Sequence, residues 1–268
     1  MSVFSNLGNK KIVIGLVHLK PLPGTPYYEE GGFEESMEKA LADVQALSGG
    51  GADGCLIQTV DRVYPAGDEA DYARVAAISL ITHEVKKAVG ADFIIGVQLM
   101  WNGITPSLAV AKVCGAAFTR CTALIGTTAS PFGLVEANPH KVQQYRRQIG
   151  AQDVAMIAEI EGYHAKWLGG EVPLTYKVQM AKMAGADAVE VMHADEEANN
   201  RMVYDIKKAF PSMPVVLGGK TNLENVSRRM KNADAVLVGS CFENKHWGGS
   251  IDQSIVKEYV SIVRSLEK

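Results

Sequence analysis

The residues best suited to chemistry in this sequence are one histidine and two closely spaced glutamates, each at the end of an apolar run. His18 ends such a run, and an imidazole can exchange protons near neutral pH or ligate a metal. Glu159 and Glu161 stand two residues apart, so on a strand both side chains would project to the same side. Crowding of two carboxylates raises the pKa of one of them, which predicts an acid and base pair or else a cation site.

These side chains also have structural interpretations, which the sequence leaves open. His18 could be a core histidine that is hydrogen-bonded to a neighbouring carbonyl group. One of the two glutamates could form an ion pair with Arg120, which lies at the end of another apolar run. In either case the residue would stabilise the fold and take no part in a reaction.

Weaker candidates stand at the ends of other apolar runs. Asp61 and His193 are the reserve candidates for proton transfer, and Glu190 is close to His193 in the chain. Gln98 and Asn102 could orient substrate hydroxyls by hydrogen bonds, although amide side chains also cap loop backbone. We therefore expect the first pair in a catalytic role and the two amides in a binding role.

Two glycine-containing turns are candidates for binding a phosphate, because glycine lets backbone N–H groups approach an anion closely. The residues expected there are Gly218, Gly219, Gly239 and Ser240. Arg120 is the cation that we assign to the same substrate-binding group. Thr221 and Glu224 also match a helix capping box, so the first turn could simply connect a strand to a helix. We favour the phosphate interpretation.

A short recurring phrase of glycine or asparagine, alanine and aspartate divides the chain into repeated units. It occurs at residues 51–53, 90–92, 185–187 and 232–234, each time just before an apolar run. Glycine or asparagine just past a helix can take the left-handed conformation that closes its last turn. The phrase therefore marks connections from a helix to the next strand.

The apolar runs are short and nearly continuous, which is typical of parallel strands that are buried on both faces. We expect strands near residues 12–18, 54–59, 93–99, 117–122, 153–160, 187–192, 214–218 and 234–239. We expect a helical segment after each strand, starting near residues 33, 69, 104, 138, 173, 197, 222 and 252.

Eight alternating units favour an α/β fold in which the strands close into a (β/α)8 TIM barrel. An open doubly wound sheet usually has fewer strands and a GxGxxG pattern after its first strand, and residues 12–18 are not followed by one. The length of 268 residues is close to the roughly 250 typical of a barrel, so we expect one domain over residues 1–268. Active sites of such barrels lie at the carboxyl ends of the strands, and phosphate often binds after strands seven and eight.

Composition argues against several classes of protein and partner. The net charge of −3, with lysine and arginine scattered along the chain, makes nucleic acid an unfavourable partner. The 4 cysteines form no CxxC pair and the N-terminus lacks a secretory signal, so we expect a cytoplasmic protein. The longest uncharged run, residues 93–111, is interrupted by polar and helix-breaking residues, which argues against a transmembrane segment.

Cofactor and metal motifs are missing from the sequence. It contains no cysteine and histidine spacing of a metal site, no GxSxG elbow and no GxxxxGK[ST] loop. We therefore expect no cofactor and no resident metal. A homo-oligomer is our expectation for the assembly, because closed symmetric assemblies are the default for proteins of this kind.

A specific phrase, IGLVHLKPLPGTP at residues 14–26, opens a likeness to a known family. The likeness continues through residues 96–98, 126–136, 145–151 and 223–226, and so covers nearly the whole chain. Through these segments the chain resembles the BtpA/SgcQ family of barrel proteins. The resemblance implies a place among the ribulose-phosphate-binding barrels.

That resemblance also implies a ligand and a range of roles. It implies a small phosphorylated, sugar-like metabolite held at Gly218, Gly219, Gly239 and Ser240. One family member is linked to photosystem I biogenesis, and others accompany sugar-uptake genes. Members often carry a Glu-Asn pair after strand two and an Asn on strand three, where this chain has Gln58-Thr59 and Gln98. The resemblance therefore implies a divergent branch of the family.

Three functions remain open at this point. The first is an isomerase or lyase that acts on a phosphorylated sugar-like metabolite, with His18, Glu159 and Glu161 as the acid and base groups. The second is a non-catalytic biogenesis, assembly or regulatory factor, which would carry an exposed apolar patch for its partner. The third is a metal-dependent hydrolase that uses His18, Glu159, Glu161 and His193.

Overall fold

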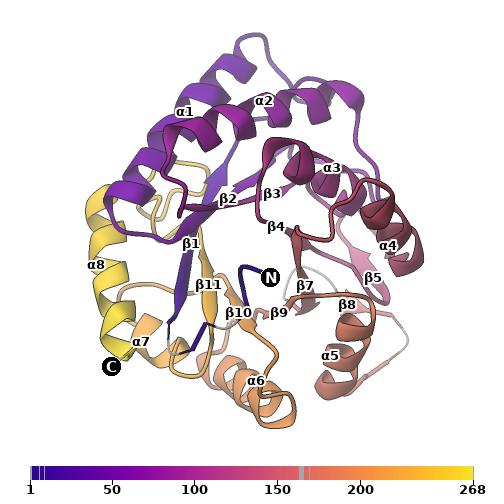
Figure 1. Ribbon diagram of the computed structural model, residues 1–268, viewed down its shortest axis with the longest axis vertical. Helices are drawn as coiled ribbons and strands as arrows, with labels where there is room; N and C mark the ends of the chain where they lie inside the picture. The colour runs from indigo at the N-terminus through magenta and orange to yellow at the C-terminus, as the bar shows by residue number, and fades with distance from the viewer. Residues whose placement is uncertain (1, 6, 9, 163–165, 169, 268) are drawn as a thin grey trace.

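Eight parallel strands close into a barrel, as the sequence predicts (Figure 1). The computed structural model describes residues 2–5, 7–8, 10–162, 166–168 and 170–267. The strands are β1 (Ile12–His18), β2 (Gly54–Gln58), β3 (Ile94–Gln98), β4 (Phe118–Cys121), β7 (Ala155–Glu161), β9 (Ala188–Val191), β10 (Val215–Gly218) and β11 (Ala235–Val238). β1 pairs in parallel with both β2 and β11, which closes the ring.

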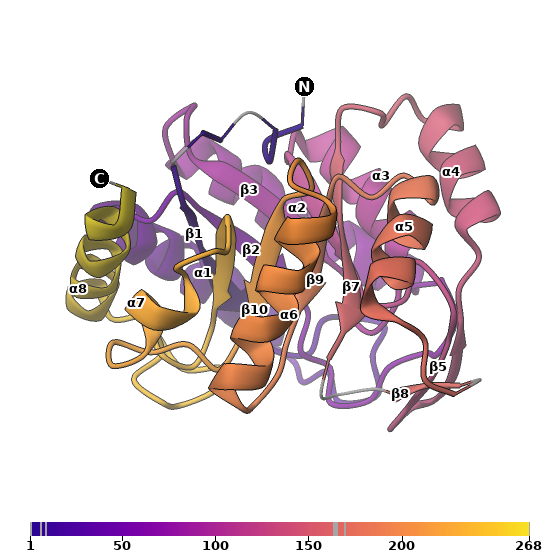
Figure 2. The same cartoon turned by 90° about the horizontal axis from the view of Figure 1, so that it is seen from below.

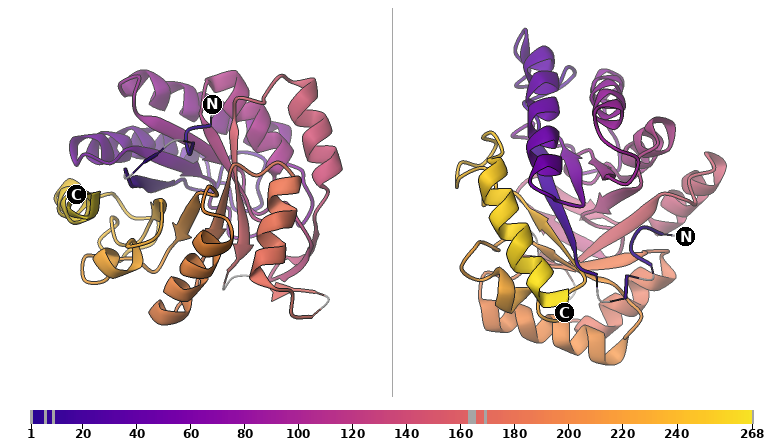
Figure 3. Two further views of the ribbon diagram at one scale, coloured as in Figure 1. Left: turned by 60° about the horizontal axis from the view of Figure 1, so that its bottom comes forward. Right: turned by 60° about the vertical axis from the view of Figure 1, so that its left-hand side comes forward.

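Helices follow the strands and form a layer around the barrel, which Figure 3 shows from two further sides. They are α1 (Gly32–Gly49), α2 (Tyr72–Ala88), α3 (Ile104–Cys114), α4 (Pro139–Gln148), α5 (Leu174–Met183), α6 (Glu196–Ala209), α7 (Val226–Arg229) and α8 (Gln253–Arg264), with a final 3-10 turn, η1 (Ser265–Glu267). Four begin after a side chain that accepts a backbone N–H bond, which satisfies a free donor of the first turn. These N-cap residues are Asp71, Asn138, Asp195 and Asp252.

The barrel interior is filled with apolar side chains from alternate positions of the strands. Phe118 fills so much of this space that a Cβ on neighbouring Gly96 would overlap its ring. Phe4 belongs to the same interior cluster, and its ring meets that of Phe118 edge to face at 5.5 Å. The N-terminal segment therefore closes one end of the barrel, at the centre of the ring in Figure 1.

A small antiparallel sheet lies at the other end, and the sequence analysis did not predict it. It consists of β5 (Thr127–Ser130), β6 (Gly133–Glu136) and β8 (Lys166–Trp167), in the order β6-β5-β8. Figure 2 shows β5 and β8 at the end of the barrel opposite the N-terminus, where the strands end. The sheet therefore stands beside the face at which a barrel carries its site.

The helix expected near residue 222 is also different from the prediction. α7 begins only at Val226 and is 4 residues long. Asn222, not Thr221, caps the turn before it, because the Asn222 side chain accepts from the N–H groups of Glu224 and Asn225 at 3.0 and 3.1 Å. The Thr221 capping box is therefore wrong.

Within the residues that the structure covers, no helix combines the length and the apolar character needed to cross a membrane.

Candidate functional site at the carboxyl end of the barrel

A layer of polar residues and glycines covers the apolar interior where the strands end. Side chains two apart on a strand share a face, so the inward positions follow directly from the interior cluster of Ile14, Leu56, Ile157 and Leu237. Inward positions closer to the carboxyl ends of the eight strands are His18, Gln58, Gln98, Arg120, Glu159, Glu190, Gly218 and Gly239. We call this layer the polar ring. It brings residues from the whole length of the chain to one surface.

Arg120 lies between two buried glutamates in this ring. Its Nε donates to Oε2 of Glu190 at 2.6 Å, and one terminal nitrogen donates to Oε2 of Glu159 at 2.8 Å. The Glu190 side chain is fully buried and that of Arg120 is 10% exposed. The ion pair between Arg120 and a glutamate, which the sequence left open, is therefore confirmed for Glu159.

Glu159 holds its proton more tightly than an ordinary glutamate. Burial raises the pKa of its carboxyl group to about 7, and the nearby carboxylates of Glu190 and Glu161 act in the same direction. The positive charge of Arg120 lowers the pKa but only partly offsets the burial. At neutral pH both protonation states of Glu159 are therefore populated, which suits a group that must accept and return a proton.

Glu161 does not share the inward face with Glu159, so that part of the prediction is wrong. The register of β7 against β9 shifts between the two residues, which is a β-bulge, and a bulge breaks the two-residue alternation. The Glu161 side chain is 38% exposed and pairs with Nζ of Lys177 on α5 at 2.6 Å. Glu190 on β9 is the carboxylate that shares Arg120 with Glu159.

His18 forms a second buried pair on another part of the ring. Its Nδ1 lies 2.6 Å from Oε1 of Glu243, and the two side chains are 2% and 0% exposed. A turn after β11, in which the N–H of Glu243 donates to the carbonyl of Gly239, brings this carboxylate back over the strand end. The ring of Trp247 also lies 5.4 Å from that of His18. The partner of His18 is thus a carboxylate and not a carbonyl group.

Two glycines of the polar ring make room for these acidic and basic groups. A Cβ on Gly218 would overlap the carboxylate of Glu190, and a Cβ on Gly239 would lie 3.1 Å from Cε1 of His18. Gly219 takes the left-handed conformation, with φ of 76°, and turns the chain after β10. The glycines at these positions therefore have a packing reason that is independent of any phosphate.

Backbone donors are nevertheless present in the turn after β11. Ser240 is exposed at the mouth, and the N–H groups of Ser240 and Cys241 donate to no acceptor among the described residues. The turn after β10 contributes less, because the N–H of Gly219 is directed at the carbonyl of Leu237 at 3.4 Å. An anion at the mouth would therefore meet its backbone donors mainly after β11.

An uncharged chain of hydrogen bonds occupies the part of the ring from β2 to β4. Nε2 of Gln58 donates to Oε1 of Gln98 at 2.7 Å, and Nε2 of Gln98 donates to the hydroxyl of Thr122 at 3.2 Å. That hydroxyl donates in turn to the carbonyl of Trp101 at 2.8 Å. Gln98 is thus placed in the ring. Asn102 binds the backbone N–H of Ala123 at 2.8 Å, so it caps a loop.

Asp61 and His193 lie apart from this constellation. Asp61 is buried and pairs with Arg74 of α2, and it also accepts from the N–H of Leu22 at 3.4 Å, so it holds the loop after β1. His193 is exposed after β9, and its Nδ1 accepts from the N–H of Asp195 at 3.1 Å. Asp61 therefore stabilises the loop after β1, and His193 lies on the exposed surface after β9.

A metal centre would need several ligands in one place. Across the part of the chain that the structure describes, no three His, Cys, Asp or Glu side chains gather as a metal site requires. The four residues considered for a metal have different partners: His18 pairs with Glu243, Glu159 with Arg120 and Glu161 with Lys177, and His193 accepts from the N–H of Asp195.

Glu243 and Thr122 are site residues that the sequence analysis missed. Both lie in loops, where no apolar periodicity indicates which way a side chain points. One signal for Glu243 was present, because it stands four residues after Gly239, one helical turn past a strand end. A carboxylate at that spacing can return to the barrel mouth.

Comparisons with known proteins agree with the barrel fold. The chain is 29% identical to "Photosystem I biogenesis protein BtpA" of Synechocystis sp. over 95% of this chain and 87% of that protein. It is 24% identical to "Putative sgc region protein SgcQ" of Escherichia coli over 98% and 97% of the two chains. The structure of phosphoribosyl anthranilate isomerase from Thermus thermophilus has the same fold, with a TM-score of 0.56 at 11% identity over 95% of this chain and 99% of that one. The family model described as the BtpA family matches residues 9–265, so this chain belongs to the BtpA family.

Proposed function

We propose that this protein is an enzyme that isomerises or cleaves a phosphorylated, sugar-like metabolite by proton transfer at the barrel mouth. One observation carries the proposal: the polar ring holds two acid and base groups on opposite walls. His18 is on β1 and Glu159 is on β7, which is four places away in the closed ring of eight strands. A small substrate bound between these walls would face both groups.

Glu159 is the residue that we assign to proton transfer at carbon. Its pKa of about 7 allows the carboxylate to take a proton from the carbon next to a carbonyl group and to return it to a neighbouring carbon. Arg120, which touches both Glu159 and Glu190, keeps this cluster from carrying two uncompensated negative charges. In an isomerase the proton would return to the substrate, and in a lyase Glu159 would protonate the carbanion left by C–C cleavage.

His18 is the residue that we assign to the substrate oxygen. An ionised Glu243 can only accept, so the Nδ1 of His18 carries the proton that lies between them. The Nε2 atom is then the one that exchanges a proton with a hydroxyl or carbonyl oxygen. Glu243 acts as a positioning residue, since it fixes the tautomer and the orientation of the ring.

The remaining parts of the ring would bind the substrate. The free N–H groups of Ser240 and Cys241 suit a phosphate group, and the amides of Gln58 and Gln98 suit sugar hydroxyls. The solved barrel named as a phosphoribosyl anthranilate isomerase is consistent with such a ligand on this fold. Because that protein shares only 11% identity, the assignment rests on the residues of this chain.

Deuterium exchange tests the proposed chemistry without knowledge of the product. A panel of aldose and ketose phosphates is incubated with the protein in D2O, and NMR follows deuterium uptake at the carbon beside the carbonyl group. We expect uptake with at least one member of the panel, and a loss of about 100-fold or more in Glu159→Gln. Glu161→Gln is the matched control and retains the rate, because Glu161 lies outside the ring. No uptake with any member, or equal rates in the two variants, overturns the proposal.

A second candidate function is that of an assembly factor without a reaction. The observation in its favour is the name of the Synechocystis relative, a photosystem I biogenesis protein. Under this alternative, a cell that carries only His18→Gln with Glu159→Gln would keep the normal phenotype, whereas the enzyme proposal predicts the phenotype of a deletion. Complementation of a deletion strain therefore separates the two functions.

We also propose that the protein works in a reducing compartment such as the cytoplasm. All four cysteines are free thiols, and burial raises the pKa of Cys55 and Cys121 so that both remain protonated. A homo-oligomer remains our prediction for its assembly.

A further inference from the structure

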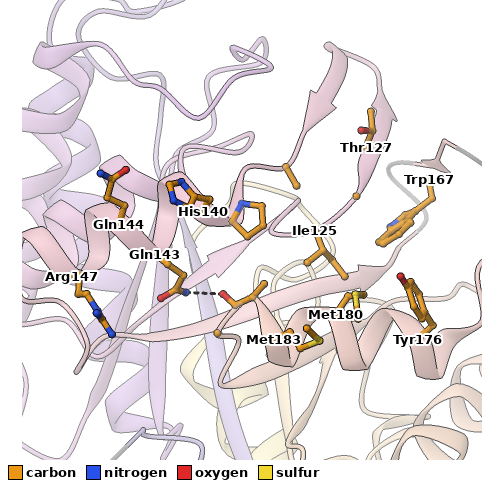
Figure 4. Close-up of a pocket in the computed structure, with 15 residues that line it drawn as sticks. Ile125, Thr127, His140, Gln143, Gln144, Arg147, Trp167, Tyr176, Met180 and Met183 are labelled. Atoms are coloured by element: carbon orange, nitrogen blue, oxygen red, sulfur yellow. Dashed lines mark hydrogen bonds between the residues drawn. The ribbon is translucent and has the colours of Figure 1, made fainter.

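The layer of helices around the barrel has an opening between α4 and α5. α4 packs on α3 and α5 packs on α6, as neighbouring barrel helices do. Between α4 and α5 lies a cavity of about 1020 Å³, which we call the α4–α5 groove (Figure 4). Residues of α4, α5 and the start of β5 line it, and no residue of the polar ring does. The proposed reaction makes no use of it.

One part of the groove is apolar and adaptable. Its apolar lining includes Ile125, Trp167, Tyr176, Met180 and Met183. Met183 is 74% exposed and Tyr176 is 50% exposed, although both are large hydrophobic side chains. Methionine side chains adjust their shape to a partner at low cost, which is why they are frequent at binding surfaces. The groove therefore offers an apolar surface that water covers in the isolated chain.

The openness of the groove favours a large partner over a small ligand. Small-molecule sites usually enclose most of the ligand surface, and residues that remain half exposed or more cannot do so. A segment of another protein that lies in the groove would bury Tyr176 and Met183 together. α4 and α5 are 10 residues long each, and a helix laid along them would continue the ring of helices around the barrel.

Charge indicates what kind of helix would fit. α4 and α5 contain no acidic residue, although the whole chain has a net charge of −3. Arg147 on α4 is exposed and is the charged residue that lines the groove, and it forms no ion pair within the described part of the chain. His140 lies along the same wall (Figure 4). A partner must therefore supply negative charges beside its apolar stripe.

We propose that the α4–α5 groove binds an acidic amphipathic helix of another protein. The apolar stripe of this helix, at a spacing of three and four residues, would contact Met180, Met183 and Tyr176. Its acidic residues would face Arg147. A second copy of this chain is a poorer occupant, because a symmetric dimer through this face would bring two basic surfaces together.

Synthetic peptides test the proposal directly. The probe is a fluorescent helical peptide of about 15 residues made of Leu, Ala and Glu, with Leu at positions i, i+3, i+4 and i+7. One control has the same composition in an order that forms no apolar face, and a second has Lys in place of every Glu. Fluorescence anisotropy measures binding to the full chain. We expect saturable binding of the acidic amphipathic peptide, at least about tenfold tighter than either control, and weaker binding at high salt.

Variants locate the binding to the groove. Met183→Glu and Arg147→Gln should each weaken binding of the acidic peptide by about tenfold or more. The matched controls are Val113→Glu on α3, where the valine is 82% exposed, and Arg201→Gln on α6, where the arginine is 78% exposed. Both controls should bind as the wild type does.

Three results overturn the proposal. The first is equal binding of the acidic, scrambled and lysine peptides, and the second is an unchanged affinity in Met183→Glu. The third is a dimer in light scattering that Met183→Glu converts to a monomer, since a second copy would then occupy the groove. Deuterium exchange in Met183→Glu should stay normal, which keeps this test independent of the proposed reaction.

Discussion

Two sectors of the polar ring lie at the same depth in the barrel but differ in their chemistry. In the sector of β4, β7 and β9, Arg120, Glu159 and Glu190 form a charged cluster. In the sector of β2 and β3, Gln58 and Gln98 form an uncharged chain of hydrogen bonds that cannot exchange protons near neutral pH. The contrast separates a sector that carries ionisable groups from a sector that carries none.

Burial of the charged sector also costs more free energy than burial of the uncharged sector. Removing charges from water costs several kcal/mol per ion, and a buried ion pair seldom recovers more than this cost. Amide side chains that satisfy one another carry no such cost. A buried charged cluster is therefore weak evidence for stability, and its place at the mouth of the barrel favours a role in function.

Arg120→Met should give the largest loss of stability. It leaves two glutamates in the barrel interior without the cation that they share, and removal of one partner from a buried pair typically costs about 3–5 kcal/mol. Urea unfolding at neutral pH measures the change in the free energy of unfolding. A loss below about 1 kcal/mol would mean that water solvates this cluster.

Glu159→Gln should remove a pH dependence of stability. Because the pKa of Glu159 is raised in the folded protein to about 7, its contribution is fully present below the pKa of an unfolded glutamate and is lost as the pH rises through 7. The wild type should therefore lose up to about 3 kcal/mol between pH 4.5 and 7 relative to this variant. Unfolding curves of both proteins across this range measure the difference, and parallel pH profiles would contradict the assignment.

Gln98→Leu should have a moderate effect that does not depend on pH. It removes the oxygen that accepts from Gln58 and the donor to the Thr122 hydroxyl, so two buried hydrogen bonds are lost, which costs about 1–3 kcal/mol. The same unfolding experiment at two pH values shows whether the loss is constant. A loss that grows with pH would indicate that the two sectors are coupled.

Glu161→Gln should have the smallest effect. The Glu161 side chain is 38% exposed, and glutamine keeps an oxygen that can accept from the buried Nζ of Lys177, so we expect a loss of about 1 kcal/mol or less. A larger loss in unfolding experiments would show that this pair supports the β-bulge of β7.

The sequence predicts the barrel well because the signals are repeated. Buried parallel strands produce apolar runs. The Gly-Ala-Asp motif at residues 185–187 and its repeats each precede such a run. The ends of the apolar runs give the carboxyl ends of the strands, which is why His18, Gln98, Arg120 and Glu159 could be placed at one end of the molecule.

Other parts of the site could not be predicted, for physical reasons. Alternation along a strand is a local rule, and the β-bulge between Glu159 and Glu161 depends on pairing with β9, which is distant in the chain. Glu243 reaches His18 through a loop turn that carries no periodic pattern. The α4–α5 groove depends on the packing of two helices that the sequence does place, but at an unknown spacing.

Titration of the glutamate carboxyl groups measures whether Glu159 has a raised pKa in the folded protein. In protein labelled with 13C at the glutamate side-chain carboxyl groups, the account predicts one resonance that titrates near pH 7, disappears in Glu159→Gln and remains in Glu161→Gln. Titration of every glutamate below about pH 5, or a near-neutral resonance that survives in Glu159→Gln, would contradict it.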